Sequence, residues 1–262
     1  MSFPTVDYER RGHVAWVTMN RPEALNAMND ELKRDLKLAW EEVRQDRDVW
    51  AVILTGAGGR GFCAGADLRS SRAGEPPVDD PYWLMQTTDS LESGLEVWKP
   101  IIAAVNGHAI GIGLTLAMAS DFRIASENAT FGFPEVRLGM PTVMGAIRAP
   151  QVIGMSNALD LLLTGERIDA ETALRWGLVR ELVPLDRLYE RAEDLAARLC
   201  RSGPRAVQAT KEIAVRGQGL PFGDAFRLGE AIRRLARDAA KNDIQEGLAA
   251  YRERREPQFH NH

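Results

Sequence analysis

Short runs of aliphatic and β-branched residues alternate with one amphipathic stretch in the first part of the chain. Two runs, residues 6–10 and 14–19, flank a polar turn and predict a β-hairpin. A helix is expected next, because Asn29 or Asp30 can cap its first turn. Its apolar positions recur with the helical period: Leu32, Leu36, Ala39, Trp40 and Val43. The uninterrupted apolar run 50–55 predicts a strand covered on both faces, as in an α/β layer structure.

The remaining pattern changes from mixed to wholly helical. Residues 101–105 form another apolar, β-rich run, and a helix-prone run, 114–120, follows after a glycine-bearing turn. Short helices are then expected at 146–153, 156–163 and 170–176, with a strand at 178–183. From residue 185 onward only helical spacing is found. Pro204 and Pro221 are well placed for the first turns of two further helices.

One intermediate stretch is harder to assign. Residues 70–80 are rich in Ser and Pro, a composition typical of a surface loop. Helical spacing returns over 81–97, and Trp83, Met85 and Trp98 could line an apolar pocket there. Ordinary core packing explains these three side chains equally well.

The length and composition indicate a globular protein with one large core. The chain has 262 residues, of which 45% are hydrophobic, so it can bury a large core in one domain or in one domain with an appendage. Since the pattern becomes wholly helical towards the end, we expect a core formed by residues 1–200 and a helical region formed by residues 201–262.

The charge balance argues against two classes of partner. With 33 basic and 37 acidic residues the net charge is −4, so no general attraction to nucleic acid or to an anionic membrane is predicted. The N-terminus lacks the apolar segment of a signal peptide and no run is long enough to span a bilayer, so we expect a cytoplasmic protein. The two cysteines and four histidines show no spacing typical of a disulfide framework or a metal site.

Two glycine-bearing turns are the strongest candidates for a functional site. Five glycines lie between Gly56 and Gly65, which indicates a backbone that bends sharply or approaches something closely. The phosphate-binding patterns that end in Lys-Ser/Thr or read GxGxxG are absent, and a plain flexible loop remains an alternative.

The second turn, Gly111-Ile112-Gly113, stands between a strand and a helix. Such a junction leaves backbone N–H groups unpaired at the positive end of the helix dipole, which suits an anion or a developing oxyanion. Close packing is the alternative for these glycines. Glu135, held between Phe133-Pro134 and Gly139, is a candidate acid, although a lone Glu in a turn is ordinarily solvated.

Motifs in a fixed order along nearly the whole chain resemble the crotonase superfamily, the enoyl-CoA hydratase/isomerase fold. The segments that carry the resemblance are NRPEALNA (20–27), FCAGAD (62–67), NGHAIGIG (106–113), FGFPEVRLG (131–139), LTGERI (163–168) and EGL (246–248). The resemblance implies an α/β spiral of repeated ββα turns. It also implies a C-terminal helical region that forms trimer contacts, often in a dimer of trimers.

The resemblance also implies a substrate and its binding positions. Backbone N–H groups at Ala64 and Ile112 are expected to bind the thioester oxygen of an acyl-CoA, with no cofactor beyond CoA and no metal. We expect Arg254 to come from a neighbouring subunit of a homotrimer or hexamer, although each arginine could instead be a solvated surface residue. The positions expected to bind CoA are Arg21, Ala24, Leu25, Ala64, Gly65, Ala66, Asp67, Leu68, Arg69, Tyr251 and Arg254.

Departures from the family pattern shape the expected reaction. Family hydratases carry one catalytic glutamate at the position of Glu135 and another at the position of Thr115, so only one is kept here. Ile112 replaces a glycine, and Val143 stands where some members carry a third acid. Thr115 cannot act as a base, but its hydroxyl could hold a water or bond back to the preceding turn. Arg137 could face Glu135 or form an outward salt bridge.

One carboxylate is enough to move a proton between two carbons, whereas hydration of a double bond ordinarily employs two. We therefore expect 3-enoyl-CoA to 2-enoyl-CoA isomerisation with Glu135 as the sole acid/base. The alternative is a 2-enoyl-CoA hydratase that uses Glu135 and a water near Thr115. A non-catalytic acyl-CoA binding protein is a further alternative, against which the retention of Glu135 argues.

Overall fold

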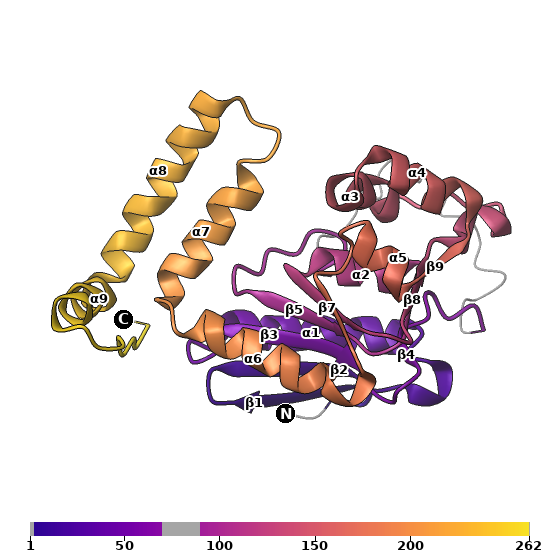
Figure 1. Cartoon of the computed structure of the whole chain (residues 1–262), viewed down its shortest axis with the longest axis horizontal. Helices are drawn as coiled ribbons and strands as arrows, with labels where there is room; N and C mark the ends of the chain where they lie inside the picture. The colour runs from indigo at the N-terminus through magenta and orange to yellow at the C-terminus, as the bar shows by residue number, and fades with distance from the viewer. Residues whose placement is uncertain (1–2, 70–89, 262) are drawn as a thin grey trace.

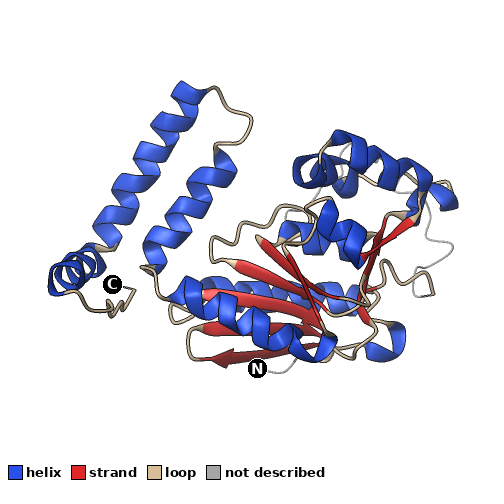
Figure 2. Ribbon diagram, viewed as in Figure 1, coloured by secondary structure: helices blue, strands red, loops and turns tan. Residues whose placement is uncertain are grey.

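A computed structural model describes residues 3–69 and 90–261 of the chain. Two sheets form its centre, and Figure 2 shows helices on both sides of the larger one. The larger sheet has the order β1-β2-β3-β5-β7-β10, in which only β1 is antiparallel to its neighbour. Its strands are β1 (Val6–Arg11), β2 (Val14–Met19), β3 (Ala51–Gly56), β5 (Ile101–Val105), β7 (Phe122–Ser126) and β10 (Glu181–Val183).

The chain passes repeatedly from the larger sheet to a smaller one. After β3, β5 and β7 it enters a strand of the smaller sheet, whose order is β4-β6-β8-β9. This alternation produces the expected spiral of ββα turns. The strands of the smaller sheet are β4 (Gly61–Cys63), β6 (His108–Ile110), β8 (Thr130–Gly132) and β9 (Arg167–Asp169).

The hairpin and the first helix are confirmed. β1 and β2 pair in antiparallel register from Val6 opposite Met19 to Arg11 opposite Val14. The side chain of Asn29 accepts a hydrogen bond of 2.9 Å from the Leu32 N–H and so caps helix α1 (Asp30–Gln45).

Helices cover both faces of the larger sheet, which explains its uninterrupted apolar strands. All residues of β3 and β5 are buried. On one face α6 (Leu188–Cys200) packs against β3, β5 and β7, and the other face belongs to the main core with α1 and α2 (Ile112–Ala119). The expected short helices are α3 (Met144–Ile153), α4 (Met155–Thr164) and α5 (Ala170–Arg175). Three 3₁₀ turns among the described residues are η1 (Pro22–Ala24), η3 (Pro134–Leu138) and η4 (Leu185–Arg187).

The last helices leave the sheets, as the change of pattern indicated. Figure 1 shows α7 (Pro204–Arg216) and α8 (Phe222–Ala239) side by side, projecting from the core, with α9 (Lys241–Glu253) beyond them. Pro204 opens α7 and Pro221 precedes α8.

The expectation of a helix over residues 81–97 is wrong for its described part. Residues 90–94 form a turn and residues 95–97 follow without regular structure, because the Ser90 and Ser93 side chains bond to each other and to the local backbone and Gly94 has a φ of +106°. Trp98 does not line a pocket with the active residues; the Arg216 guanidinium lies over its ring at 5.1 Å. The loop predicted at 70–80 and the side chains of Trp83 and Met85 lie outside the described residues.

Two buried amides hold the first glycine turn against its neighbours. Asn106, at the end of β5, donates to the carbonyls of Gly56 and Gly58 and accepts from the Gly56 N–H at 3.3 Å. Asn26 donates to the Gly61 carbonyl at 2.7 Å and to the Ala57 carbonyl at 3.0 Å. Because both side chains are fully buried, these bonds fix where the turn stands relative to β5 and η1.

Candidate active site

The two glycine turns are in direct contact. A Cβ atom added to Gly111, whose φ is +54°, would lie 2.9 Å from Oε1 of Glu135 and 3.9 Å from the Cα of Gly65. A Cβ atom on Gly113 would overlap the carbonyl oxygen of Cys63 and lie 2.8 Å from its Cβ. Glycine is required at both positions, since a side chain at Gly113 would push the two turns apart, and one at Gly111 would be strained at this φ and would displace the Glu135 carboxylate.

The prediction that the Ala64 N–H is a free donor is wrong. This group donates to the Leu25 carbonyl at 3.1 Å, because the chain after β4 runs beside the η1 segment. Just beyond it, the Met28 N–H donates to the Gly65 carbonyl at 2.8 Å and the Asp67 N–H to the Met28 carbonyl at 2.9 Å.

These bonds pair Ala66 with Met28 in a parallel bridge. In such a bridge the central residue's own N–H points away from its partner strand. The N–H groups of Ala66 and Ile112 have no hydrogen-bond partner within residues 3–69 and 90–261. The available donor of the first turn therefore belongs to Ala66, two residues after the predicted one.

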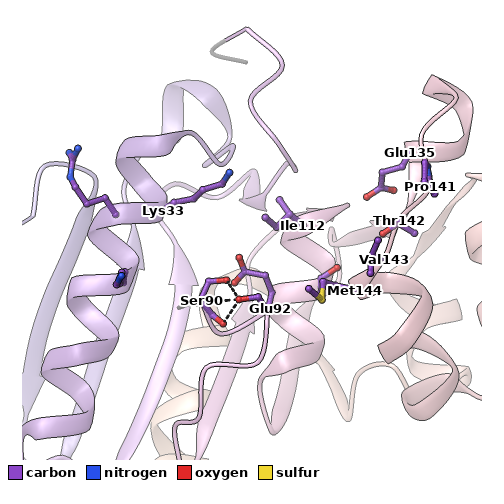
Figure 3. A pocket seen from close by; sticks show the side chains of 13 residues that line it. Lys33, Ser90, Glu92, Ile112, Glu135, Pro141, Thr142, Val143 and Met144 are labelled. Atoms are coloured by element: carbon purple, nitrogen blue, oxygen red, sulfur yellow. Dashed lines mark hydrogen bonds between the residues drawn. The ribbon is translucent and has the colours of Figure 1, made fainter. Parts of the chain in front are cut away.

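A cavity of about 680 Å³ opens beside the Ile112 turn (Figure 3). Its walls come from α1, the turn at residues 90–94, the start of α2, and the segment from η3 to α3. The lining residues used below are Lys33, Glu92, Ile112, Thr115, Glu135 and Val143.

Glu135 is half-buried and faces this cavity from η3. Its Oε2 atom is buried and has no hydrogen-bond partner in the described part of the chain. Burial raises the pKa of this carboxyl above its usual value, and a bond from its own backbone opposes the rise. The alternative of an ordinary solvated Glu does not hold.

Arg137 points away from Glu135. Its guanidinium donates to the Thr164 carbonyl at 3.0 Å and to Oε1 of Glu166 at 3.3 Å. Of the two expected orientations, the structure therefore has the outward salt bridge, and Arg137 does not hold the Glu135 carboxyl in its ionised form.

Thr115 occupies the same face of α2 as Ile112, one turn along the helix. Its hydroxyl donates to the Gly111 carbonyl at 3.2 Å, one of the two roles predicted for it. With its proton used in this way, the hydroxyl oxygen can still accept a hydrogen bond. The side chain is 2% exposed and lines the cavity.

Glu92 is a cavity residue that sequence reasoning missed. It is 7% exposed and lies on the turn that the helical spacing assigned to a helix. A glutamate on a predicted amphipathic helix is expected to face solvent, so no local signal marks it. Only the fold brings it beside Ile112. Lys33, on the exposed side of α1, was missed for the same reason.

A second cavity, of about 630 Å³, contains most of the positions expected to bind CoA. Predicted positions in its wall are Arg21, Ala24, Leu25, Ala66, Asp67, Leu68 and Arg69. Arg21 pairs with Asp67 at 3.0 Å, so its charge is already partly compensated. Asp67 also accepts a hydrogen bond of 3.1 Å from the Arg69 N–H, so its side chain orders its own loop.

Four predicted positions do not line either cavity. Ala64 and Gly65 lie in the turn between them, where Gly65 contacts Ile110. Tyr251, which is 85% exposed, and Arg254, which ends α9 with a φ of +55°, belong to the projecting helices (Figure 1). Within one chain they do not join the site.

Two kinds of feature, a metal-binding cluster and a membrane-spanning helix, are absent from the described residues. No group of three or more His, Cys, Asp or Glu side chains in residues 3–69 and 90–261 is arranged to hold a metal ion. None of the helices in the same ranges combines the length and apolar character needed to cross a membrane.

Comparison with known proteins agrees with this fold. The sequence profile of the family described as Enoyl-CoA hydratase/isomerase matches residues 9–262. The chain is 40% identical over 257 residues to (E)-benzylidenesuccinyl-CoA hydratase of Thauera aromatica, covering 97% of this chain and 98% of that protein. It is 38% identical to enoyl-CoA hydratase EchA19 of Mycobacterium tuberculosis, covering 99% and 98%.

Solved structures of enoyl-CoA hydratases share the fold of this chain. The crystal structure of an enoyl-CoA hydratase from M. tuberculosis H37Rv superposes with a TM-score of 0.88 at 35% identity, covering 99% of this chain and 100% of that one. The fold and the sequence together define an enzyme with the crotonase architecture. The chain belongs to the enoyl-CoA hydratase/isomerase family.

The raised pKa of Glu135 predicts a pH-dependent stability difference between the wild-type protein and Glu135→Gln. A carboxyl whose pKa is higher in the folded than in the unfolded state ionises first in the unfolded chain. The native state therefore loses stability as the pH rises through the usual glutamate range, and Gln abolishes this loss. Denaturant unfolding should show the free energy of unfolding of the variant increasing relative to that of the wild type as the pH rises above about 4.

The matched control is Glu127→Gln, on an exposed turn. It should show no such trend. A Glu135→Gln variant that loses stability relative to the wild type as the pH rises would contradict the assigned direction.

Proposed function

We propose that this chain binds an acyl-CoA thioester with its carbonyl oxygen at the N–H groups of Ala66 and Ile112, and that Glu135 moves a proton at the neighbouring α-carbon. One observation carries this proposal. Gly111 directly precedes Ile112, and its Cα lies beside both the Glu135 carboxyl and Gly65, which directly precedes Ala66. An oxyanion held by both donors would therefore stand next to an acid/base group.

The two cavities divide the ligand accordingly. Ala66 belongs to the cavity that holds the positions expected for CoA, and Ile112 belongs to the cavity with Glu135. The CoA moiety would occupy the first and the acyl group the second, with the thioester between them.

Enolate formation explains why these groups are needed together. Removing or adding a proton at the α-carbon passes through a state in which negative charge collects on the thioester oxygen. Fixed backbone donors stabilise that oxygen more than the ground-state carbonyl, and no metal or redox cofactor is required for the step. Burial makes Glu135 a stronger base when ionised and keeps it available as an acid nearer neutral pH.

Among the reactions open to such a site, we favour the reversible hydration of a 2-enoyl-CoA. Relatives with 40% and 38% identity are named as hydratases of CoA thioesters. The sequence-based preference for isomerisation depended on Glu135 being the only carboxylate at the site, and Glu92 removes that premise.

Isomerisation of 3-enoyl-CoA to 2-enoyl-CoA is the second candidate. It is favoured by Thr115, which replaces the first glutamate of family hydratases and whose hydroxyl is bonded to the helix backbone. A non-catalytic binding protein is disfavoured. Binding an acyl-CoA does not require the Glu135 carboxyl, whose buried Oε2 has no hydrogen-bond partner among the described residues.

The first functional prediction concerns Glu135→Gln. The substitution keeps the shape of the side chain but removes its acid/base function, while the oxyanion donors are backbone groups and stay in place. Hydrogen–deuterium exchange at the α-carbon of a saturated acyl-CoA, and turnover of 2-enoyl-CoA and 3-enoyl-CoA, should each fall by roughly 10²-fold or more. The dissociation constant of the CoA ester should change by only a few fold.

Glu127→Gln serves again as the control and should leave all three rates unchanged. Turnover that is fast in the wild type and equally fast in Glu135→Gln would refute the assignment of the acid/base.

The projecting helices lead us to propose a homotrimer or hexamer. Phe222 and Phe226 stack on each other with ring centroids 6.2 Å apart, and they remain 85% and 59% exposed. Further exposed apolar side chains on α8 and α9 are Leu235, Ile244 and Leu248. An apolar face of this extent is typical of a subunit contact. Such an assembly could bring Tyr251 and Arg254 of one subunit to the CoA site of another.

Light scattering after size-exclusion chromatography should give three or six times the chain mass of 29.0 kDa. Phe226→Asp should shift the population towards the monomer, because it places a charge in the contact. Leu38→Asp, which alters an exposed leucine on α1, should leave the mass unchanged. A monomeric wild-type protein at micromolar concentration would contradict the proposal.

A further inference from the structure

Glu92 is held at the acyl cavity by the way its turn is anchored. Its neighbour Leu91 and, further along, Val97 are each 4% exposed and belong to the main core. Ser90 and Ser93 close the turn through their hydroxyl groups, which lie 2.7 Å apart. Glu92 stands between these fixed points and is directed into the cavity, where Figure 3 shows its carboxyl near Ile112.

The surroundings of this carboxyl are unusual for a structural residue. It is 7% exposed, yet no described residue donates a hydrogen bond to it and it has no salt bridge within 4.0 Å among the described residues. A charged group so placed costs stability unless something else satisfies it. Its oxygen atoms face the same cavity as Glu135 and Thr115, so a water or a substrate can do so.

Arg148 interacts electrostatically with Glu92 from outside hydrogen-bond range, and Lys33, Arg34 and Lys37 line the same cavity as Glu92. The guanidinium of Arg148 donates to the carbonyl of the neighbouring Leu91 at 3.5 Å. Burial lowers the pKa of Arg148 and the charge of Glu92 opposes that effect. The Arg148 guanidinium therefore lies close enough to the turn to attract the Glu92 carboxyl.

We propose that Glu92 is the second catalytic acid/base of the site and performs, from another segment of the chain, the task of the glutamate that Thr115 replaces. This inference rests on the proposed hydration reaction. Water adds its oxygen to C3 of the 2-enoyl group and gives a proton to Glu92. The C2=C3 electron pair moves towards the thioester to form the enolate, and protonated Glu135 then gives its proton to C2.

All protons in this reaction are accounted for by the two carboxyl groups and water. Glu92 ends protonated and Glu135 ends ionised, and proton exchange with water restores both. Dehydration is the reverse, with Glu135 taking the C2 proton and Glu92 protonating the leaving hydroxyl. Two acid/base groups of opposite starting charge are what this addition requires.

Thr115 has a defined place in this arrangement. Because its proton goes to the Gly111 carbonyl, the hydroxyl can only accept a hydrogen bond from the catalytic water. A water that donates one hydrogen to Thr115 and the other to Glu92 would be oriented and activated at once. Threonine is also shorter than glutamate, so it leaves room for that water beside Ile112.

The test is Glu92→Gln, assayed in two reactions that use different groups. Hydration of 2-enoyl-CoA should fall by roughly 10²-fold or more, since it needs both carboxyls. Deuterium exchange at the α-carbon of a saturated acyl-CoA should stay within about threefold, since it needs only Glu135.

Two further variants serve as a control for Glu92→Gln and as a test of the role of Thr115. Glu96→Gln, in the same segment but exposed and paired with Arg216, should leave both reactions unchanged. Thr115→Ala should slow hydration less than Glu92→Gln does, because it removes an acceptor and keeps the base.

The possible results are distinct. If Glu92→Gln hydrates as fast as the wild type, or loses exchange as completely as hydration, the catalytic role of Glu92 is overturned. If Glu92→Gln does not fold, Glu92→Asp decides: a reduced hydration rate with intact exchange supports the role, and two unchanged rates overturn it. A wild-type protein that exchanges α-protons but hydrates no 2-enoyl-CoA overturns the hydration proposal itself.

Discussion

The contact between the two glycine turns is the constraint on which the rest of the site depends. Gly113 packs on the Cys63 backbone at a distance that admits no side chain, and Gly111 lies beside Gly65 and the Glu135 carboxylate. The turns follow β4 and β6, which are neighbours in the smaller sheet. Because the spiral returns to that sheet after each strand of the larger one, residues some 47 positions apart in the chain stand in contact. The proposed oxyanion donors are backbone N–H groups, so their geometry is as rigid as the fold.

The proposed chemistry uses two carboxyl side chains that the fold places in largely buried surroundings. Burial raises the pKa of Glu135, and the Glu92 carboxyl lies almost fully buried without a described hydrogen-bond donor. The raised pKa of Glu135 costs native-state stability above the usual glutamate range, and the proposed mechanism gives both carboxyls a role once a substrate enters the cavity. The large apolar core, with β3 and β5 buried along their whole length, can tolerate that cost.

Much of this architecture could be predicted from the sequence, because periodic apolar patterns and helix caps are local signals. The β1–β2 hairpin, the Asn29 cap and the apolar β3 were all recognisable in that way. The family resemblance supplied the spiral and the positions around Arg21 and Asp67 that the second cavity brings together.

The sequence-based predictions that were wrong or missing concern features that long-range contacts decide. Whether Ala64 or Ala66 offers a free N–H depends on which neighbour the chain bonds, namely Leu25 and Met28, and no sequence pattern reports this. Likewise, Glu92 lies on a turn that Ser90, Ser93 and Gly94 take out of the helix its spacing suggested. Its place beside Ile112 follows only from long-range packing, which also decided that Arg137 faces Glu166.

The most direct test of the central claim is a crystal structure of the protein with a bound acyl-CoA or 2-enoyl-CoA thioester. The account predicts that the thioester oxygen accepts hydrogen bonds of about 2.7–3.1 Å from the N–H groups of Ala66 and Ile112, with the α-carbon facing Glu135. A thioester oxygen bound away from these two groups, or held by the Ala64 N–H, would contradict it.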